Sequence, residues 1–307
     1  MTAETSQVSL PKLLPLCLMV FAAFITVDRA VSAGLKRVLS ASHDRYLRVY
    51  QPGPAATSVV VGDSRAGAHF PHSRHDEPQE FFNLGQGGMG LPVSDALLRD
   101  YIDTRGRPSR VIIETLFLAD EGSGIGAAGL AQVYSARVRH LVRQEDPASA
   151  RTSDWFTSLQ FNHNRFILAL VGLFRERGSR IYRGHISREV IQEVNAWAPF
   201  RLEIPERNAQ VLTDMVAYLK AQDIEVVMVM TPLLPERIRK ITNLPAFLDG
   251  VQALADATGA RFVNSIDHVR EHRYFADSLH LNAQGRGIFL QDFWRQVGVP
   301  RALRGTR

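Results

Sequence analysis

Three consecutive valines at 59–61, followed directly by Gly62, constrain the fold of this chain more than any other feature. A run with no polar face predicts a strand that is covered on both sides, as in a parallel sheet with helices on each face. Gly62 then permits a sharp turn where the strand ends. Open α/β sheets bind ligands at that edge, so the polar residues 63–65 become candidates for a functional site.

Further apolar runs alternate with segments of helical spacing along the chain. Strands that alternate with helices imply right-handed crossovers and a parallel sheet. We therefore predict a three-layer α/β/α domain. The remaining expected strands are 110–118, 224–230 and 261–264, and the expected helices between them are 93–104, 207–221 and 246–258.

A long segment, about 119–205, separates two of these strands and departs from a minimal fold. Residues 128–142 and 155–175 have helical spacing, with a polar stretch at 144–153 between them. Long insertions in compact domains commonly shape binding sites. We expect a helical cap over or beside Ser64.

Near the N-terminus, residues 13–27 are uncharged and strongly apolar. This run is shorter than the roughly 20 residues that span a bilayer, but small apolar residues continue it after Asp28 and Arg29, and flanking charges can snorkel. We expect a membrane anchor at 1–35, a linker with a helix at 36–55, and a catalytic domain at 56–307. A buried amphipathic helix and a cleavable signal, cut near 31–33, are the alternatives.

Charge and cysteine content narrow the remaining classes. The 307 residues carry a net charge of +5, and the arginines are scattered rather than gathered into a stripe with aromatic residues. This pattern predicts no nucleic-acid site. Cys17 is the one cysteine, so no intramolecular disulfide is possible and the redox compartment stays open.

A serine and an Asp-x-x-His pair are the strongest chemical signal. A serine hydroxyl becomes a good nucleophile when a base takes its proton, and an imidazole base needs a third group to fix its tautomer. Ser64 follows the first buried strand, and Asp277 and His280 lie three residues apart near the end of the chain. A surface ion pair or a helix cap is the plainer interpretation of an isolated Asp-x-x-His.

These segments resemble the SGNH, or GDSL-type, hydrolase family. Residues 62–65 match its first block, with Arg65 in place of the usual leucine, while 83–88 resemble the second block and 277–285 the last. The resemblance implies that Ser64 is the nucleophile, that Asp277 and His280 are the acid and base, and that the backbone N–H groups of Ser64 and Gly88 hold the oxyanion.

The third block of that family is missing. Its Gly-x-Asn-Asp should follow the next strand, but Glu114 and Thr115 stand there and no Asn is available. We expect that Thr115, or a donor from the insertion, replaces the lost side-chain donor. Arg65 and Asp63, beside the nucleophile, are candidates for substrate binding, with Arg65 reading an anionic acceptor. Surface pairing or capping is the alternative role of Arg65.

The resemblance implies a serine esterase or O-acyltransferase that acts on acyl esters, in particular acetyl esters of cell-envelope carbohydrate, without a cofactor. Membrane-tethered relatives act beside a multi-spanning acyltransferase, which would make such a protein a partner. They work outside the inner membrane, so we expect a periplasmic domain. The basic residues after the apolar run favour the cytoplasmic side by positive-inside counting. A non-catalytic polysaccharide-binding or assembly subunit remains the alternative function.

Three histidines, His69, His72 and His75, repeat at intervals of three and could be metal ligands. Pro71 disrupts a helix between them, and histidines on polar loops are usually solvated. We therefore predict no metal site.

Overall fold

A five-stranded parallel sheet forms the centre of the domain in the computed structural model, which describes residues 10–44, 46–71, 80–122, 124–174 and 181–298. The strand order is β2-β1-β3-β4-β5, and every neighbouring pair is parallel. The strands are β1 (Ser58–Val61), β2 (Phe81–Asn83), β3 (Arg110–Glu114), β4 (Glu225–Met230) and β5 (Arg261–Asn264).

The two faces of the sheet are buried in two separate apolar cores. Val59 and Val61 face the core that contains residues of α3 (Leu91–Arg105), α9 (Glu206–Lys220) and α11 (Leu244–Thr258). Val60 faces the other core, with residues of α2 (Ser64–His69) and α12 (Ala283–Val297). The alternation of side chains along a strand places neighbouring valines in opposite layers. The predicted three-layer α/β/α fold is confirmed.

Between β3 and β4 the chain forms short helices rather than the two long ones expected. The expected helix at 128–142 is divided because Ser135 starts α5 by accepting a hydrogen bond from the Val138 N–H. The expected helix at 155–175 is also divided, because α6 ends at Trp155 and a 3₁₀ turn separates it from the next helix. The helices are α4 (Ile125–Ala128), α5 (Ala136–Glu145), α6 (Pro147–Trp155), α7 (Phe166–Val171), and α8 (Arg188–Ala196), with 3₁₀ turns η2 (Leu116–Ala119), η3 (Gly129–Val133) and η4 (Thr157–Phe161).

Two boundaries differ from the sequence-based expectation. Strand β3 ends at Glu114, and residues 116–119 continue as a 3₁₀ turn. The expected linker helix at 40–51 is only the 3₁₀ turn η1 (Leu47–Tyr50), and its neighbour Tyr46 is fully buried with it. Burial of these apolar side chains makes this segment part of the domain core. The remaining elements are α10 (Pro235–Lys240) and η5 (His272–Tyr274).

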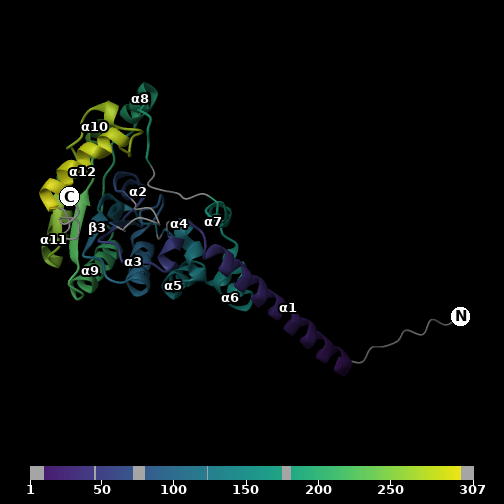
Figure 1. Ribbon diagram of the computed structural model, residues 1–307. Coiled ribbons are helices and arrows are strands. Elements are labelled where there is room, and N and C mark those ends of the chain that lie inside the picture. The colour runs from purple at the N-terminus through teal and green to yellow at the C-terminus, as the bar shows by residue number, and fades with distance from the viewer. Residues whose placement is uncertain (1–9, 45, 72–79, 123, 175–180, 299–307) are drawn as a thin grey trace.

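Helix α1 (Leu10–Leu39) projects away from the domain (Figure 1). Its part from Leu13 to Leu39 is long and apolar enough to cross a membrane, and it is almost entirely unburied. Soluble core helices are mostly buried, so exposure of this apolar surface favours a membrane environment. Helices α6 and α7 flank the point where α1 leaves the domain (Figure 1).

Candidate active site

Ser64 lies at the carboxyl end of β1, where the chain turns into α2. The turn requires Gly62, whose φ is +149° and where a Cβ would lie 2.8 Å from the Ala66 Cβ and 2.9 Å from the Glu114 Cβ. Asp63 caps α2 by accepting a hydrogen bond of 2.8 Å from the Arg65 N–H. The strand end, the glycine and the cap together fix the position of the serine.

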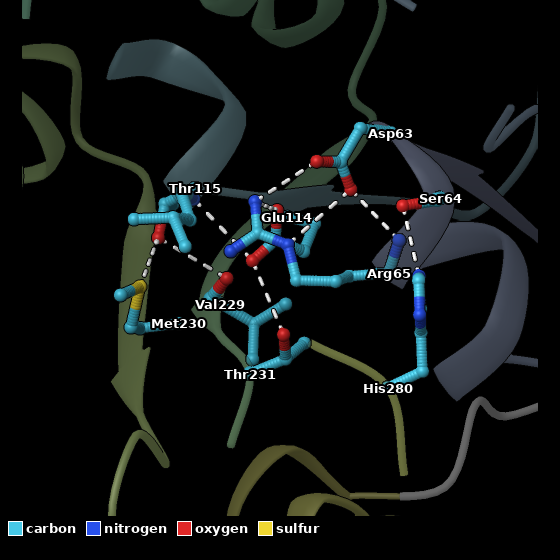
Figure 2. Close-up of polar contacts among 10 residues, drawn as sticks. Asp63, Ser64, Arg65, Glu114, Thr115, Val229, Met230, Thr231 and His280 are labelled. Atoms are coloured by element: carbon cyan, nitrogen blue, oxygen red, sulfur yellow. Dashed lines mark hydrogen bonds and ion pairs between the residues drawn. The ribbon is translucent and has the colours of Figure 1, made fainter. Parts of the chain in front are cut away.

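Three side chains from opposite ends of the sequence form one hydrogen-bonded chain. The Ser64 Oγ lies 2.9 Å from the His280 Nε2, and the Nδ1 of the same ring lies 2.8 Å from the Asp277 Oδ2 (Figure 2 shows the first contact). The second contact makes Nδ1 the protonated nitrogen, which leaves Nε2 to accept the serine proton. This is the geometry that a serine nucleophile requires.

Asp277 is itself held by the loop that it belongs to. Its Oδ1 accepts hydrogen bonds from the backbone N–H groups of Leu279 and His280, at 2.8 and 2.9 Å. Burial raises the pKa of Asp277, but the hydrogen bonds from the His280 ring and from these two N–H groups outweigh it, so the pKa lies below its ordinary value. The carboxylate therefore stays ionised at neutral pH and can stabilise an imidazolium.

Two backbone N–H groups near the serine were predicted to receive an oxyanion. Gly88 adopts a φ of +74° in the turn after β2, and a Cβ on its neighbour Gly87 would lie 3.6 Å from the Ser64 Cβ. Within the described part of the chain, the N–H groups of Ser64 and Gly88 donate no hydrogen bond. Available N–H groups beside a nucleophile are the usual components of an oxyanion hole.

Asn83, at the end of β2, holds this turn against α2. Its side-chain N–H₂ donates to the carbonyl oxygens of Ala66 and Phe70, and its Oδ1 accepts from the Gly85 N–H at 2.8 Å. A Cβ on Gly85 would lie 2.3 Å from the Gly67 nitrogen, so the two segments touch through their backbones. The asparagine of the second block is thus a structural clamp between α2 and the glycine-rich turn.

The Thr115 hydroxyl does not face Ser64. It donates to the Val229 carbonyl oxygen at 3.2 Å and lies beside the Met230 sulfur, on the side of the sheet that leads to β4 (Figure 2). Thr115 is fully buried there. The expectation that it replaces the missing oxyanion donor does not fit this orientation, since strand pairing with β4 holds the hydroxyl away from the nucleophile.

Arg65 is buried rather than presented to a substrate. Its guanidinium lies between the carboxylates of Asp63 and Glu114, at 3.1 and 3.0 Å, and the side chain is 2% exposed (Figure 2). Arg65 therefore does not read an anionic acceptor, and Asp63 is engaged in the same ion pair. The substrate-binding roles expected for both residues do not fit, because two carboxylates already pair with the guanidinium charge in the interior beside the serine.

Glu114 is the buried acid of this network, and the sequence did not single it out. Its Oε1 also accepts hydrogen bonds from the Thr231 hydroxyl and the Leu116 N–H, at 3.2 and 3.3 Å. Burial raises the pKa of Glu114 to about 7, although Arg65 opposes the shift. Asp63, Arg65 and Glu114 thus alternate in charge beside Ser64. Their contacts hold the turn after β1, but removing these charged groups from water costs free energy.

Two further residues touch His280 or its loop and were missed from the sequence. The Tyr182 ring stacks on the His280 ring, with centroids 4.9 Å apart and an angle of 22° between the planes. His69 is fully buried, and its Nε2 accepts a hydrogen bond of 3.0 Å from the Leu281 N–H. Burial, and secondarily the nearby His280, hold the pKa of His69 well below its ordinary value, so this ring stays neutral.

The expected insertion contributes to the site through Tyr182, and a Cβ on Gly88 would lie 3.8 Å from the Ala127 Cβ. Part of the segment thus lies beside His280 and the turn that carries Gly88. Of the three spaced histidines, His72 and His75 lie outside the described residues, and His69 is in the core. Among the described residues, no cluster of His, Cys, Asp and Glu could hold a metal ion.

Comparisons with known proteins are limited to structure. No protein-family model matches the sequence, and no curated protein matches it. The chain is similar in structure to a protein from Bacteroides fragilis NCTC 9343 assigned as an acylhydrolase, at 12% identity over 82% of this chain and 92% of that chain, with a TM-score of 0.38.

Two other solved structures are also similar. One, from Streptococcus pneumonia and assigned as a platelet activating factor, shares 11% identity over 91% of this chain and 98% of that chain, with a TM-score of 0.41. The other, a GDSL-like lipase from Bacteroides thetaiotaomicron VPI-5482, shares 14% identity over 78% and 87% of the two chains, with a TM-score of 0.36. At these identities and TM-scores the similarity does not assign a function. The interpretation of the site is therefore based on the contacts among Ser64, His280 and Asp277.

Proposed function

We propose that the protein is a membrane-anchored serine esterase or O-acyltransferase of the SGNH type. The observation that carries the proposal is the hydrogen-bonded chain from the Ser64 hydroxyl through the His280 ring to the Asp277 carboxylate. The substrates in this proposal are acyl esters, with acetyl esters of cell-envelope carbohydrate as the class that the sequence resemblance implies.

The chemistry proceeds through an acyl-enzyme. His280 Nε2 takes the proton of the Ser64 hydroxyl while the oxygen attacks the ester carbonyl, and Asp277 stabilises the imidazolium that forms. The N–H groups of Ser64 and Gly88 donate to the oxyanion of the tetrahedral intermediate. The intermediate collapses, the imidazolium gives its proton to the leaving alkoxide, and the acyl group stays on the serine.

The second half of the cycle decides between hydrolysis and transfer. Water, activated by the same histidine, returns a carboxylic acid, whereas a sugar hydroxyl in its place gives a new ester. An oxyanion hole of two backbone donors, without the usual side-chain donor, loses about 3–4 kcal/mol of stabilisation in the chemical step relative to a complete one. Slow hydrolysis suits a transferase, because the acyl-enzyme then survives until an acceptor arrives.

The cellular setting is part of the proposal. An anchor formed by α1 would place the domain at a bilayer surface, and the exposed apolar stretch from Leu13 to Leu39 supports that placement. We assign the domain to the periplasmic side of the inner membrane, next to a membrane-bound acyltransferase partner. This side agrees with the family resemblance but not with positive-inside counting. A reporter fused to the C-terminus distinguishes the two sides.

The alternative function is a non-catalytic polysaccharide-binding or assembly subunit. The absence of the third-block asparagine and the orientation of the Thr115 hydroxyl favour it. Intact hydrogen bonding among Ser64, His280 and Asp277 favours catalysis, because a binding subunit has no need to keep a base against a serine hydroxyl.

Hydrolysis of a small activated acetate ester by the full-length protein tests the proposal. We expect turnover that falls by about 10⁴-fold or more in Ser64→Ala, as for other triad nucleophiles. Ser58→Ala, at a buried serine on the same strand outside the triad, is the control and should stay active. Equal turnover by wild type and Ser64→Ala would refute the mechanism.

A further inference from the structure

The carboxylate of Asp28 attaches helix α1 to the domain through several hydrogen bonds. Asp28 accepts hydrogen bonds from both the backbone N–H and the side-chain hydroxyl of Thr157 and of Ser158, at 2.5 to 3.1 Å. These two residues begin η4. Four charge-assisted hydrogen bonds to a buried carboxylate make this a rigid junction. Helix α1 and η4 are therefore held at a fixed distance from each other.

Aromatic contacts continue from this junction along the apolar part of α1. The Trp155 and Phe21 rings lie with centroids 6.2 Å apart, and the Phe156 and Phe24 rings 5.5 Å apart. Trp155 is nevertheless 62% exposed. Any bilayer that surrounds Phe21 must also meet Trp155, a residue type enriched at membrane interfaces. This edge of the insertion therefore lies at the membrane surface if α1 is inserted.

A cleft of about 280 Å³ opens at the same junction, between α1, α5 and η4. Its lining combines three cationic, three polar and three apolar side chains. The lining residues are Arg29, Ser32, Ala33, Lys36, Val133, Arg139, Thr157, Gln160 and Phe161. A volume of this size accommodates a phosphate group with a few attached atoms.

The three cations of the cleft have no carboxylate partner among the described residues. Arg29 and Arg139 each donate to a backbone carbonyl, and the Lys36 ammonium lies over the Tyr134 ring, 5.1 Å from its centroid. The Arg139 Nε is buried and has no hydrogen-bond partner in the described part of the chain. Three cationic side chains that line one cleft without an ion-pair partner attract an anion.

Within the described residues, the two nearby acids form no ion pair with these three cations. Asp28 is occupied by its four donors from η4, and the Asp154 carboxylate pairs with Arg143 at 2.6 Å. Arg29 lies two residues and Lys36 nine residues beyond the apolar run at 13–27, which is about 3 and 14 Å along the helix axis. These two positions span the headgroup layer above a bilayer core.

We propose that this cleft binds the phosphate of an anionic phospholipid headgroup. Arg29, Lys36 and Arg139 contact the phosphate oxygens, and the acyl chains leave the cleft beside Trp155 and the apolar part of α1. The site is separate from Ser64 and independent of ester chemistry. It depends on the membrane anchoring proposed above, which is tested separately by sedimentation of the full-length protein with vesicles.

Native mass spectrometry of the full-length protein in detergent, titrated with a short-chain phosphatidylglycerol, tests the proposal. A diacylglycerol with the same chains lacks the phosphate, and inorganic phosphate lacks the chains. The test variant is Lys36→Gln with Arg139→Gln. The matched control, Arg37→Gln with Arg151→Gln, removes the same charge from exposed positions of α1 and α6 outside the cleft.

We expect one tightly retained phosphatidylglycerol, with an affinity about tenfold lower in the cleft variant and within about twofold of wild type in the control. Equal losses in both variants would overturn the site, since the effect would then be net charge alone. Diacylglycerol bound as tightly as phosphatidylglycerol would overturn the role of the phosphate. Inorganic phosphate bound as tightly as the lipid would overturn the assignment to a lipid. Ester turnover by the same variants reports on Ser64 separately.

Discussion

The turn below Ser64 and the cleft beside α1 both gather charged side chains, but they treat those charges in opposite ways. Beside the serine, Arg65 is buried between Asp63 and Glu114, so its positive charge is already paired. In the cleft, Arg29 and Lys36 have no carboxylate partner among the described residues. Cations that are paired with buried carboxylates stabilise a backbone turn, whereas cations without an ion-pair partner are available to a ligand. The same residue type therefore has a structural role in one region and a proposed binding role in the other.

The largest expected effect comes from variants of α1 that abolish membrane binding and leave the Ser64 site unchanged. Leu18→Arg with Val20→Arg places two charges in the apolar run, each costing about 2.5–3.5 kcal/mol at a bilayer centre. We expect the protein to move from the membrane to the soluble fraction. Turnover of a soluble ester should stay within about twofold of wild type. Leu18→Ile with Val20→Leu is the control, and a release of that control or an equal collapse of turnover would break the separation.

The next effect concerns the charge network under the serine. The folded protein binds the Glu114 proton more tightly than the unfolded chain does, because its pKa is raised from 4.5 to about 7. This contribution to stability is complete below about pH 4.5 and is lost as the pH rises through about 7. The Tm of wild type, relative to Glu114→Gln, should therefore fall by several degrees over that window and then level off. If the Tm values of wild type and Glu114→Gln change in parallel over this pH range, the raised pKa of Glu114 is contradicted.

A smaller effect is expected from His69, the neutral histidine whose ring lies beside that of His280. His69→Leu leaves the buried Leu281 N–H without an acceptor, which costs about 1–3 kcal/mol of stability. Turnover should also fall, because Leu281 follows His280 directly. Thermal unfolding and kcat of this variant measure both effects. His69→Gln, which restores an acceptor, should recover part of each, and His140→Leu at an exposed position should change neither.

The smallest effect is expected at Tyr182. Tyr182→Leu removes the ring that stacks on His280, and aromatic pairs contribute about 0.5–1.5 kcal/mol beyond burial. We expect kcat/KM for a soluble ester to fall about two- to tenfold, with Tyr182→Phe close to wild type. If Phe and Leu behave alike, the stacking has no part in positioning the imidazole.

The parts of the site that could be predicted are those set by local pattern and chain order. Three valines before Gly62 place Ser64 at a strand end, and the interval between Asp277 and His280 lets one side chain reach the other within a single loop. Strands β1, β3, β4 and β5 and helices α9 and α11 followed from the apolar pattern in the same way, whereas β2 was not predicted. The apolar residues of each of these elements recur regularly within one short segment, so no distant contact was needed to recognise them.

The missed parts depend on contacts between distant segments. The partner of Arg65 is Glu114, 49 residues away, and the partner of the His69 ring is the Leu281 N–H, 212 residues away. Nothing near Arg65 or His69 in the sequence indicates that either is buried. The orientation of Thr115 likewise follows from pairing with β4. One signal was available for Glu114, because a carboxylate that follows four residues of a buried strand needs a cationic partner.

Reaction of the full-length protein with a fluorophosphonate, followed by intact-mass and peptide analysis, tests the central claim most directly. The reagent requires an activated serine and no knowledge of the natural ester. We predict a single adduct on Ser64, no adduct in Ser64→Ala, and much slower labelling in His280→Ala. Failure of the folded wild type to react, or labelling of Ser64→Ala at the same rate, would contradict the proposed nucleophile.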